Sequence, residues 1–128
     1  MVKAIQAAYK AVQKAIASAY YTGTCTIIER RDVRDEKTKI TRKSEVVVIE
    51  NHPCKISYEK ANAAVSSDAA TVVSLNTKLF ISPEIAINSG SKIVVEQNGV
   101  ITEYCMSGEP AVYPTHKEVV LELFKEWA

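Results

Sequence analysis

The sequence is poor in the residues that build most catalytic sites. Its four glycines, at positions 23, 90, 99 and 108, are scattered over 128 residues. A phosphate-binding loop needs clustered glycines, so that backbone N–H groups can approach the phosphate. A hydrolase nucleophile elbow needs a serine in the pattern Gly-x-Ser-x-Gly. Neither pattern occurs in the sequence, and we therefore expect a protein that is not an enzyme.

Cysteine and histidine are also scarce. The three cysteines, Cys25, Cys54 and Cys105, are far apart, and an odd number without a secretion signal is typical of reduced thiols. A structural zinc site usually needs two closely spaced ligand pairs, but His52 and Cys54 have no second pair, and the proline between them indicates a turn. A thiolate–imidazole pair of Cys25 or Cys105 with His116 has no local support. We expect no metal and no cofactor.

Excess charge and long apolar runs are missing as well. The net charge is +1, which gives the whole molecule no polyanion-binding signature. No apolar run approaches the roughly 20 residues of a membrane helix. Lys3, Lys10 and Lys14 interrupt the N-terminal apolar residues, which excludes the apolar core of a signal peptide. With 47% hydrophobic residues, the sequence predicts one globular domain over residues 1–128, made in a cytoplasm and without a membrane partner.

The first 20 residues predict an amphipathic helix. Ile5, Val12 and Ile16 recur at helical spacing with several alanines, whereas lysines and glutamines occupy other faces. Such a helix either covers the core of its own domain or packs against a neighbouring subunit, and we favour the first arrangement.

From Gly23 onward the pattern becomes that of short strands. Apolar or alternating runs at 24–28, 46–49, 54–58, 78–81, 93–97 and 100–105 predict strands, with a turn at 51–53. Asn98-Gly99 between two such runs is a strong hairpin signal. We prefer a strand to a helix for 118–124, and Trp127 indicates a packed C-terminus. The fold class is therefore mainly β: a small antiparallel β-barrel or sandwich over 23–127, with an N-terminal amphipathic helix and long inter-strand loops.

Two segments lack the periodicity of core strands and are expected to protrude. Residues 29–45 carry seven basic and five acidic side chains and read as a long hairpin or loop whose ends are strands. This segment is either a solvated hairpin with weak salt bridges or an arm that reaches a partner. Residues 59–76 are small and polar, and they form either a mobile surface loop or a segment that a partner orders.

The C-terminal third carries a series of strand-and-turn motifs. They are KLFISP at 78–83, INSGSKIVV at 87–95, Asn98-Gly99, Tyr104 followed by SGEP at 107–110, YPTH at 113–116 and VVLEL at 119–123. Together these motifs resemble the small neck proteins of phages and prophages of Gram-positive bacteria, known as head-completion, head–tail joining or stopper proteins. The resemblance covers residues 45–127 and, more loosely, the basic N-terminal helix.

The resemblance implies a structural protein of the virion neck, assembled in the host cytoplasm. Such proteins form a ring, six-fold or twelve-fold here, below the portal and adaptor proteins. The ring closes the channel through which the packaged double-stranded DNA passes, and it docks a tail terminator or tail tube below. On this reading the partner-interface candidates are the basic residues of the helix and of segment 29–45: Lys3, Lys10, Lys14, Arg30, Arg31, Arg34, Lys37, Lys39, Arg42 and Lys43.

The segment 59–76 is the candidate for a channel-facing loop under the same resemblance. Its candidate residues are Asn62, Ser66, Ser67, Asp68 and Thr71. It has no basic residue after Lys60, so we do not expect it to hold phosphates directly.

Two alternative functions stay open. The first is a tail-side structural protein such as a tail terminator. The second, from a different class, is a small nucleic-acid-binding β-barrel, which would present aromatic side chains interleaved with basic ones on a sheet face. The strands carry acids instead, at Glu96, Glu103, Glu118 and Glu122, which disfavours this second alternative.

Overall fold

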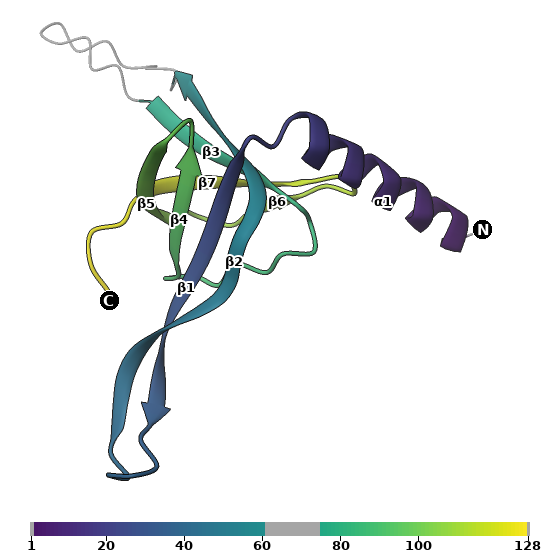
Figure 1. The fold of residues 1–128 in the computed structure, drawn as a ribbon. Helices are drawn as coiled ribbons and strands as arrows, with labels where there is room; N and C mark the ends of the chain where they lie inside the picture. Colours follow the sequence, from purple (N-terminus) through teal and green to yellow (C-terminus); the bar gives the residue numbers. More distant parts are fainter. Residues whose placement is uncertain (1, 61–74, 128) are drawn as a thin grey trace, which may run out of the picture.

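The computed structural model describes residues 2–60 and 75–127. In these residues one helix, α1 (Val2–Ala19), precedes seven strands. The strands are β1 (Gly23–Arg34), β2 (Thr41–Lys60), β3 (Leu75–Ile81), β4 (Lys92–Gln97), β5 (Val100–Met106), β6 (Ala111–Val112) and β7 (Lys117–Leu123) (Figure 1).

The strands form a closed antiparallel sheet. Their order is β3-β2-β1-β4-β5-β7, and β3 also pairs with β7, so that the sheet closes on itself, while the short β6 lies beside β7. Closure leaves few unpaired backbone edges in a small all-β domain. The expected mainly β fold with a small antiparallel barrel and an N-terminal helix is thereby confirmed.

The core lies inside the barrel and follows from alternation along the strands. In β4, in β7 and in the first half of β1, buried residues alternate with outward-facing ones, as the strand periodicity requires. Five of the largest buried side chains, Ile27, Leu79, Ile81, Ile93 and Val119, are fully inaccessible. Within residues 2–60 and 75–127, the other buried apolar residues are Cys25, Cys54, Ile56, Ile87, Val95, Tyr104 and Leu121.

Two local predictions for the C-terminal third are confirmed, the hairpin turn at Asn98-Gly99 and the strand near the end of the chain. Asn98 (φ 54°) and Gly99 (φ 76°) join β4 to β5 with two left-handed residues, as a type I′ turn demands. Residues 117–123 are the strand β7, which confirms the preference for a strand there.

Two boundary predictions are wrong. Residues 51–53 do not form a turn, because β2 runs without interruption from Thr41 to Lys60 and pairs with β1 on both sides of this point. The pairing shifts register between Cys25 and Ile28, so the left-handed Asn51 (φ 49°) occupies a β-bulge that bends the strand. Likewise, residues 59, 60, 75 and 76 belong to the β2–β3 ladder, so the strands extend into the segment expected to be a loop.

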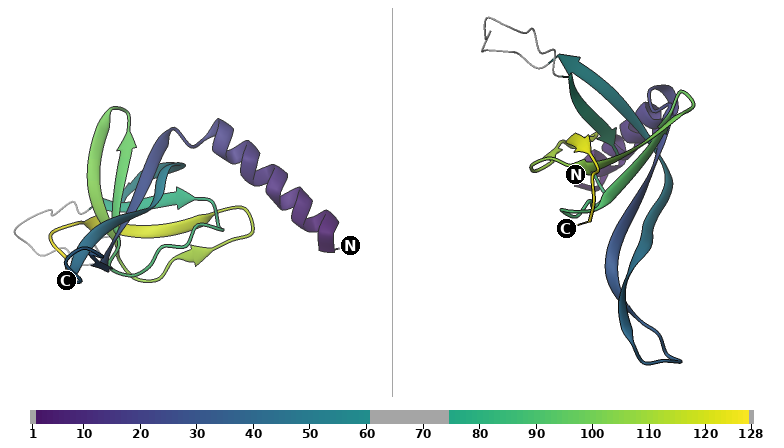
Figure 2. Two further views of the ribbon diagram at one scale, coloured as in Figure 1. Left: turned by 60° about the horizontal axis from the view of Figure 1, so that its bottom comes forward. Right: turned by 90° about the vertical axis from the view of Figure 1, so that its left-hand side faces the viewer.

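The helix α1 forms as expected, but it does not cover the core. Ile5, Tyr9 and Val12 are 52%, 41% and 44% exposed. The helix leaves the barrel at the start of β1 and projects from it, as Figures 1 and 2 show. The preferred expectation for this helix is therefore wrong, since strand residues and Ile87 of the β3–β4 connection form the core without it. None of the residues that the structure describes forms a helix long and apolar enough to cross a membrane.

Candidate partner-binding surfaces

Residues 29–45 form a two-stranded ribbon, here called the arm. The pairing of β1 with β4 ends at Ile28↔Lys92, so beyond this point β1 pairs with β2 alone. The ribbon leaves the barrel and points away from it (Figure 1, and the right view of Figure 2). The tip is closed by hydrogen bonds from the Asp35 amide to the Ile40 carbonyl (2.9 Å) and from the Lys39 amide to the Asp35 carbonyl (2.7 Å). The expected hairpin is thus present, with its strands continuing almost to the tip.

The two faces of the arm differ in chemistry. Residues directly opposite each other in a ladder point to the same side. The pairs Arg31↔Ser44 and Val33↔Arg42 therefore share one face, and the Asp35–Ile40 closure continues it. We define the apolar-basic face of the arm as Arg31, Val33, Ile40 and Arg42; its two apolar side chains are 45% and 48% exposed. Asp35, opposite Ile40 at the tip of the same face, accepts a hydrogen bond from the Lys37 amide at 2.9 Å.

The opposite face of the arm carries alternating charges. Its pairs are Arg30↔Glu45, Asp32↔Lys43 and Arg34↔Thr41. Opposite charges thus face each other across the ladder, although neither Arg30–Glu45 nor Asp32–Lys43 is close enough to form an ion pair. Unlike the apolar-basic face, these three pairs include no apolar side chain.

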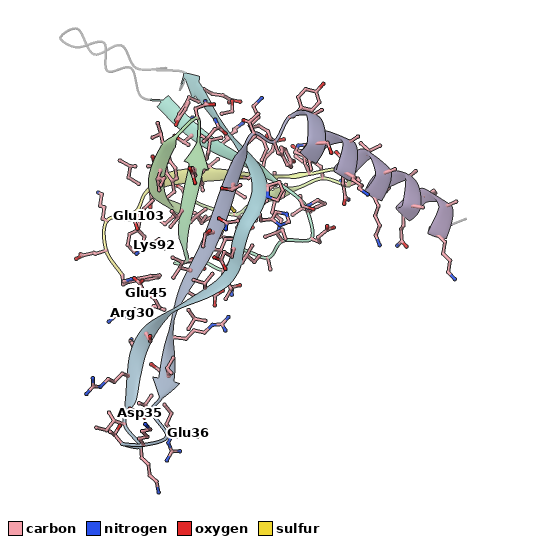
Figure 3. All side chains as sticks on the ribbon, viewed as in Figure 1. Arg30, Asp35, Glu36, Glu45, Lys92 and Glu103 are labelled. Atoms are coloured by element: carbon pink, nitrogen blue, oxygen red, sulfur yellow. The ribbon has the colours of Figure 1, made fainter. Side chains whose placement is uncertain are left out.

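A cluster around Lys92 holds the C-terminal segment at the base of the arm. The Lys92 ammonium lies 3.1 Å from Glu45 Oε1 and 3.4 Å from Glu103 Oε2. The same ammonium lies 4.9 Å from the centre of the Phe124 ring and 5.3 Å from that of Trp127. The Trp127 indole N–H donates to Glu45 Oε1 at 2.9 Å. Figure 3 shows Glu45, Lys92 and Glu103 together at the base, with Asp35 and Glu36 at the far tip.

This Lys92 cluster joins the arm, the barrel and the C-terminal segment. The hydrogen bond from Trp127 and then that from Lys92 hold the pKa of the Glu45 carboxyl below its ordinary value. Glu45 therefore stays ionised in the contact with Lys92 at neutral pH. The predicted packing of Trp127 is confirmed, and its partner Glu45 could not be identified from the sequence.

The helix α1 offers a second exposed apolar surface. It contacts the barrel near its C-terminal end, where Gln13 Nε2 donates to the Pro114 carbonyl at 2.8 Å and Ile16 is half-buried. Beyond that contact, Ile5, Tyr9 and Val12 are exposed along one side of the helix. A helix with an uncovered apolar stripe is typically stabilised by packing that stripe against something else.

A third surface lies on the outer wall of the barrel. Alternation with the buried Val95, Tyr104 and Leu121 turns Glu96, Ile101, Glu103, Cys105 and Glu122 outward. Glu96 is directly opposite Ile101, and Cys105 is opposite Glu122. Ile101 is 65% exposed. We define Glu96, Ile101, Glu103 and Glu122 as the acidic face; alternation in Ile101-Thr102-Glu103-Tyr104-Cys105 is the sequence signal that could have revealed it.

The basic residues predicted as a partner interface are all exposed, and the structure divides them between two elements. Lys3, Lys10 and Lys14 lie on α1, and the other seven lie on the arm. Among the described residues, only Arg31 of this set forms an ion pair, at 2.7 Å from Glu29. The predicted channel-loop residues Asn62, Ser66, Ser67, Asp68 and Thr71 lie outside the described residues.

The cysteines and histidines do not assemble into a reactive site in the described part of the chain. Cys25 and Cys54 are free and fully buried in the core. Contact with the Cys25 thiol, together with burial, raises the pKa of Cys54, so its thiol stays protonated. His116 Nε2 lies 2.9 Å from Glu118 Oε2. Within residues 2–60 and 75–127, no three His, Cys, Asp or Glu side chains are placed to hold a metal ion.

The fold and these surfaces define a small closed barrel with two projecting elements that expose apolar side chains. A scan against protein-family models and a search of the curated proteins each returned no match. Among solved structures, the chain is similar to the phage-like element PBSX protein xkdH from Bacillus subtilis, with 12% sequence identity and a TM-score of 0.46. The similarity covers 78% of this chain and 91% of that chain. At that TM-score and identity it carries no argument about function.

Proposed function

We propose that this chain is a structural neck protein of a tailed phage or prophage. In this role it assembles as a ring below the portal and adaptor, closes the DNA channel after packaging and docks the tail. The resemblance of residues 45–127 to head-completion and stopper proteins suggests this function. The observation that carries it is the presence of two projecting elements, the arm and α1, that leave the closed barrel with exposed apolar side chains.

A closed barrel suits the scaffold of such a ring. Its buried core is complete without the arm or the helix, so both elements are free to contact other subunits. An isolated two-stranded ribbon is only marginally stable in water. An arm and a helix that project in different directions contact different surfaces of their neighbours. Contacts between two different surfaces of the same chain are heterologous. They produce a closed ring when the rotation from one subunit to the next adds up to a full turn.

The basic side chains of the arm and of α1 also suit a protein beside packaged DNA. Seven basic residues on the arm and three on α1 are exposed. Lysines and arginines near a DNA channel attract phosphates with an affinity that falls as the salt concentration rises. On this proposal the DNA passes through the lumen, and the tail terminator or tail tube binds below the ring.

Stoichiometry on purified particles tests this proposal. The mass of the chain is measured by light scattering, first alone and then after addition to DNA-filled heads that carry portal and adaptor but lack this protein. The expected result is binding of six or twelve copies per head, with retention of the packaged DNA. Binding to tail tubes instead would favour a tail terminator. Salt-sensitive binding to free DNA, without binding to heads, would favour the nucleic-acid-binding alternative.

A further inference from the structure

We infer that the apolar-basic face of the arm docks on the acidic face of the barrel in a second copy of this chain. The inference rests on the proposed function for its ring, and it names the two surfaces that meet between neighbouring subunits. It is carried by complementary charge and apolar character on two separate surfaces of one chain.

The arm surface combines two apolar side chains with two arginines: Arg42 lies directly opposite Val33, and Ile40 lies nearer the tip, opposite Asp35. Val33 and Ile40 are about half exposed, with Arg31 and Arg42 on the same face. The six residue pairs from Glu29↔Val46 to Arg34↔Thr41 span about 17 Å at the usual rise of a strand. The arm therefore reaches well beyond the barrel that carries it.

The acidic face has the opposite charge and its own exposed apolar centre. Ile101 lies between Glu96, its partner across the ladder, and Glu103, two residues along the same strand. Beside this face, Cys105, Glu122, Leu123, Lys125 and Glu126 line an open hollow of about 350 Å³. Leu123 is 62% exposed and adds apolar surface at the hollow.

Free charges are available on both surfaces. Arg31 is paired with Glu29, and Glu103 is paired with Lys92. In contrast, Arg42, Glu96 and Glu122 form no ion pair within the described residues. Charges of this kind steer association and set the register of a contact. Arg42 is therefore the expected partner of Glu96 or Glu122 of the neighbouring copy.

The contact cannot form within one chain. The arm begins where β4 begins, at Lys92, and points away from the barrel. Glu96 and Ile101 lie near the opposite end of the β4–β5 hairpin, next to the Asn98-Gly99 turn. Because the arm and the acidic face are different surfaces, each copy can donate its arm to one neighbour and accept an arm from another. This is the heterologous arrangement that ring closure requires.

Cross-linking through the native Cys105 tests the inference. Cys105 points outward beside the acidic face, directly opposite Glu122, whereas Cys25 and Cys54 are fully buried, so Val33→Cys supplies the second reactive thiol of the intended pair. A short bismaleimide is added to this variant at about millimolar concentration and, separately, after assembly on heads. The expected result is a ladder of covalent oligomers that disappears when Cys105→Ser is combined with Val33→Cys. Asp32→Cys, on the opposite face of the arm, is the matched control and gives at most a weak ladder.

Charge reversal provides an independent readout. Arg42→Glu is expected to lower the ladder yield about tenfold, because an attractive contact with carboxylates becomes repulsive. Adding Glu96→Lys and Glu122→Lys to the same chain restores the yield. Lys43→Glu changes the net charge equally on the other face of the arm and leaves the yield unchanged.

The outcomes separate this inference from the proposed function. A ladder in solution without binding to heads supports the arm contact and overturns the neck assignment. A ring on heads without a ladder from Val33→Cys overturns the arm contact and leaves the neck assignment standing. Ladders of equal strength from Val33→Cys and Asp32→Cys, or no ladder in either setting, also overturn the arm contact.

Discussion

The barrel and the arm are built from the same two strands but are stabilised in different ways. In the barrel, the first half of β1 alternates strictly between buried and outward side chains, and Cys25 and Ile27 are inaccessible. Beyond Arg30 every residue of β1 is exposed. The barrel therefore supplies its own apolar partners, whereas the arm exposes Val33 and Ile40. On the proposed function, β1 serves two purposes, folding at one end and binding at the other.

Removing one apolar side chain from each region should give the largest contrast. Ile27→Ala is expected to lower the free energy of unfolding by about 2–5 kcal/mol, because it leaves a cavity in a closed core. Val33→Ala should change the free energy of unfolding by less than about 0.5 kcal/mol, since its side chain has no core contacts to lose. Urea denaturation of the free chain measures both. Equal losses from the two variants would contradict the division between barrel and arm.

A smaller loss of stability is expected from a substitution at Gly23, the first residue of β1. A Cβ added to Gly23 would lie 2.9 Å from the backbone oxygen of Glu96 and 3.3 Å from that of Cys54. Since both contacts are with neighbouring strands, Gly23→Ala should cost about 1–3 kcal/mol through overpacking. Thr22→Ala, one residue earlier and exposed, serves as the control in the same thermal unfolding measurement. Wild-type stability of Gly23→Ala would show that β1 can shift freely against its neighbours.

These contrasts also show how far the sequence alone could lead. The barrel strands and the Asn98-Gly99 turn were predictable because alternation and left-handed turn residues are local signals. The bend at Asn51 was not, because the same turn chemistry also fits a bulge inside one long strand. The position of α1 was missed for a related reason: periodicity identifies an apolar face but not what covers it.

The surfaces were harder to predict than the fold. Exposure of the arm followed from its charge, but the pairing that places Val33 and Arg42 on one face is a matter of strand register. The acidic face likewise depends on Glu96 lying opposite Ile101. Neither register follows from composition, because a shift by one residue would turn each set of side chains to the other side.

The Lys92 cluster, which connects the arm to the barrel, should respond to acid. The pKa of Glu45 is depressed in the folded state, so its contribution to stability is present above the unfolded pKa and is lost as the pH falls through the folded value. That loss lies below the ordinary glutamate pKa of about 4.3. We expect the emission of Trp127, the single tryptophan, to shift to the red only below about pH 4.3.

Glu45→Gln provides the control for this acid response. The variant keeps a polar side chain next to Trp127 but removes the charge that faces Lys92. Its emission should already be red-shifted at neutral pH and should change little on acidification. A wild-type shift above pH 5, or an unchanged shift in the variant, would show that another group controls the contact.

The smallest effect concerns the cysteines. Burial, and then Glu122, raise the pKa of Cys105, so this thiol should react slowly with a disulfide reagent at neutral pH and faster as the pH rises through its raised pKa. Cys25 and Cys54 should react only after unfolding, because both are inaccessible. We therefore expect one reactive thiol in the native chain and three in denaturant, counted from the chromophore that the reagent releases. Two or more fast thiols in the native chain would show that the barrel opens.

Hydrogen exchange followed by mass spectrometry, on the free chain and on the chain assembled on heads, tests the central claim most directly. The amides of β1 residues 24–28 and of β4 are expected to be protected in both states, since they lie in the closed barrel. The amides of residues 29–45 and of α1 are expected to exchange quickly in the free chain and to become protected on assembly. An arm and a helix that are equally protected in both states, or that stay unprotected on assembly, would contradict their assignment as the binding elements.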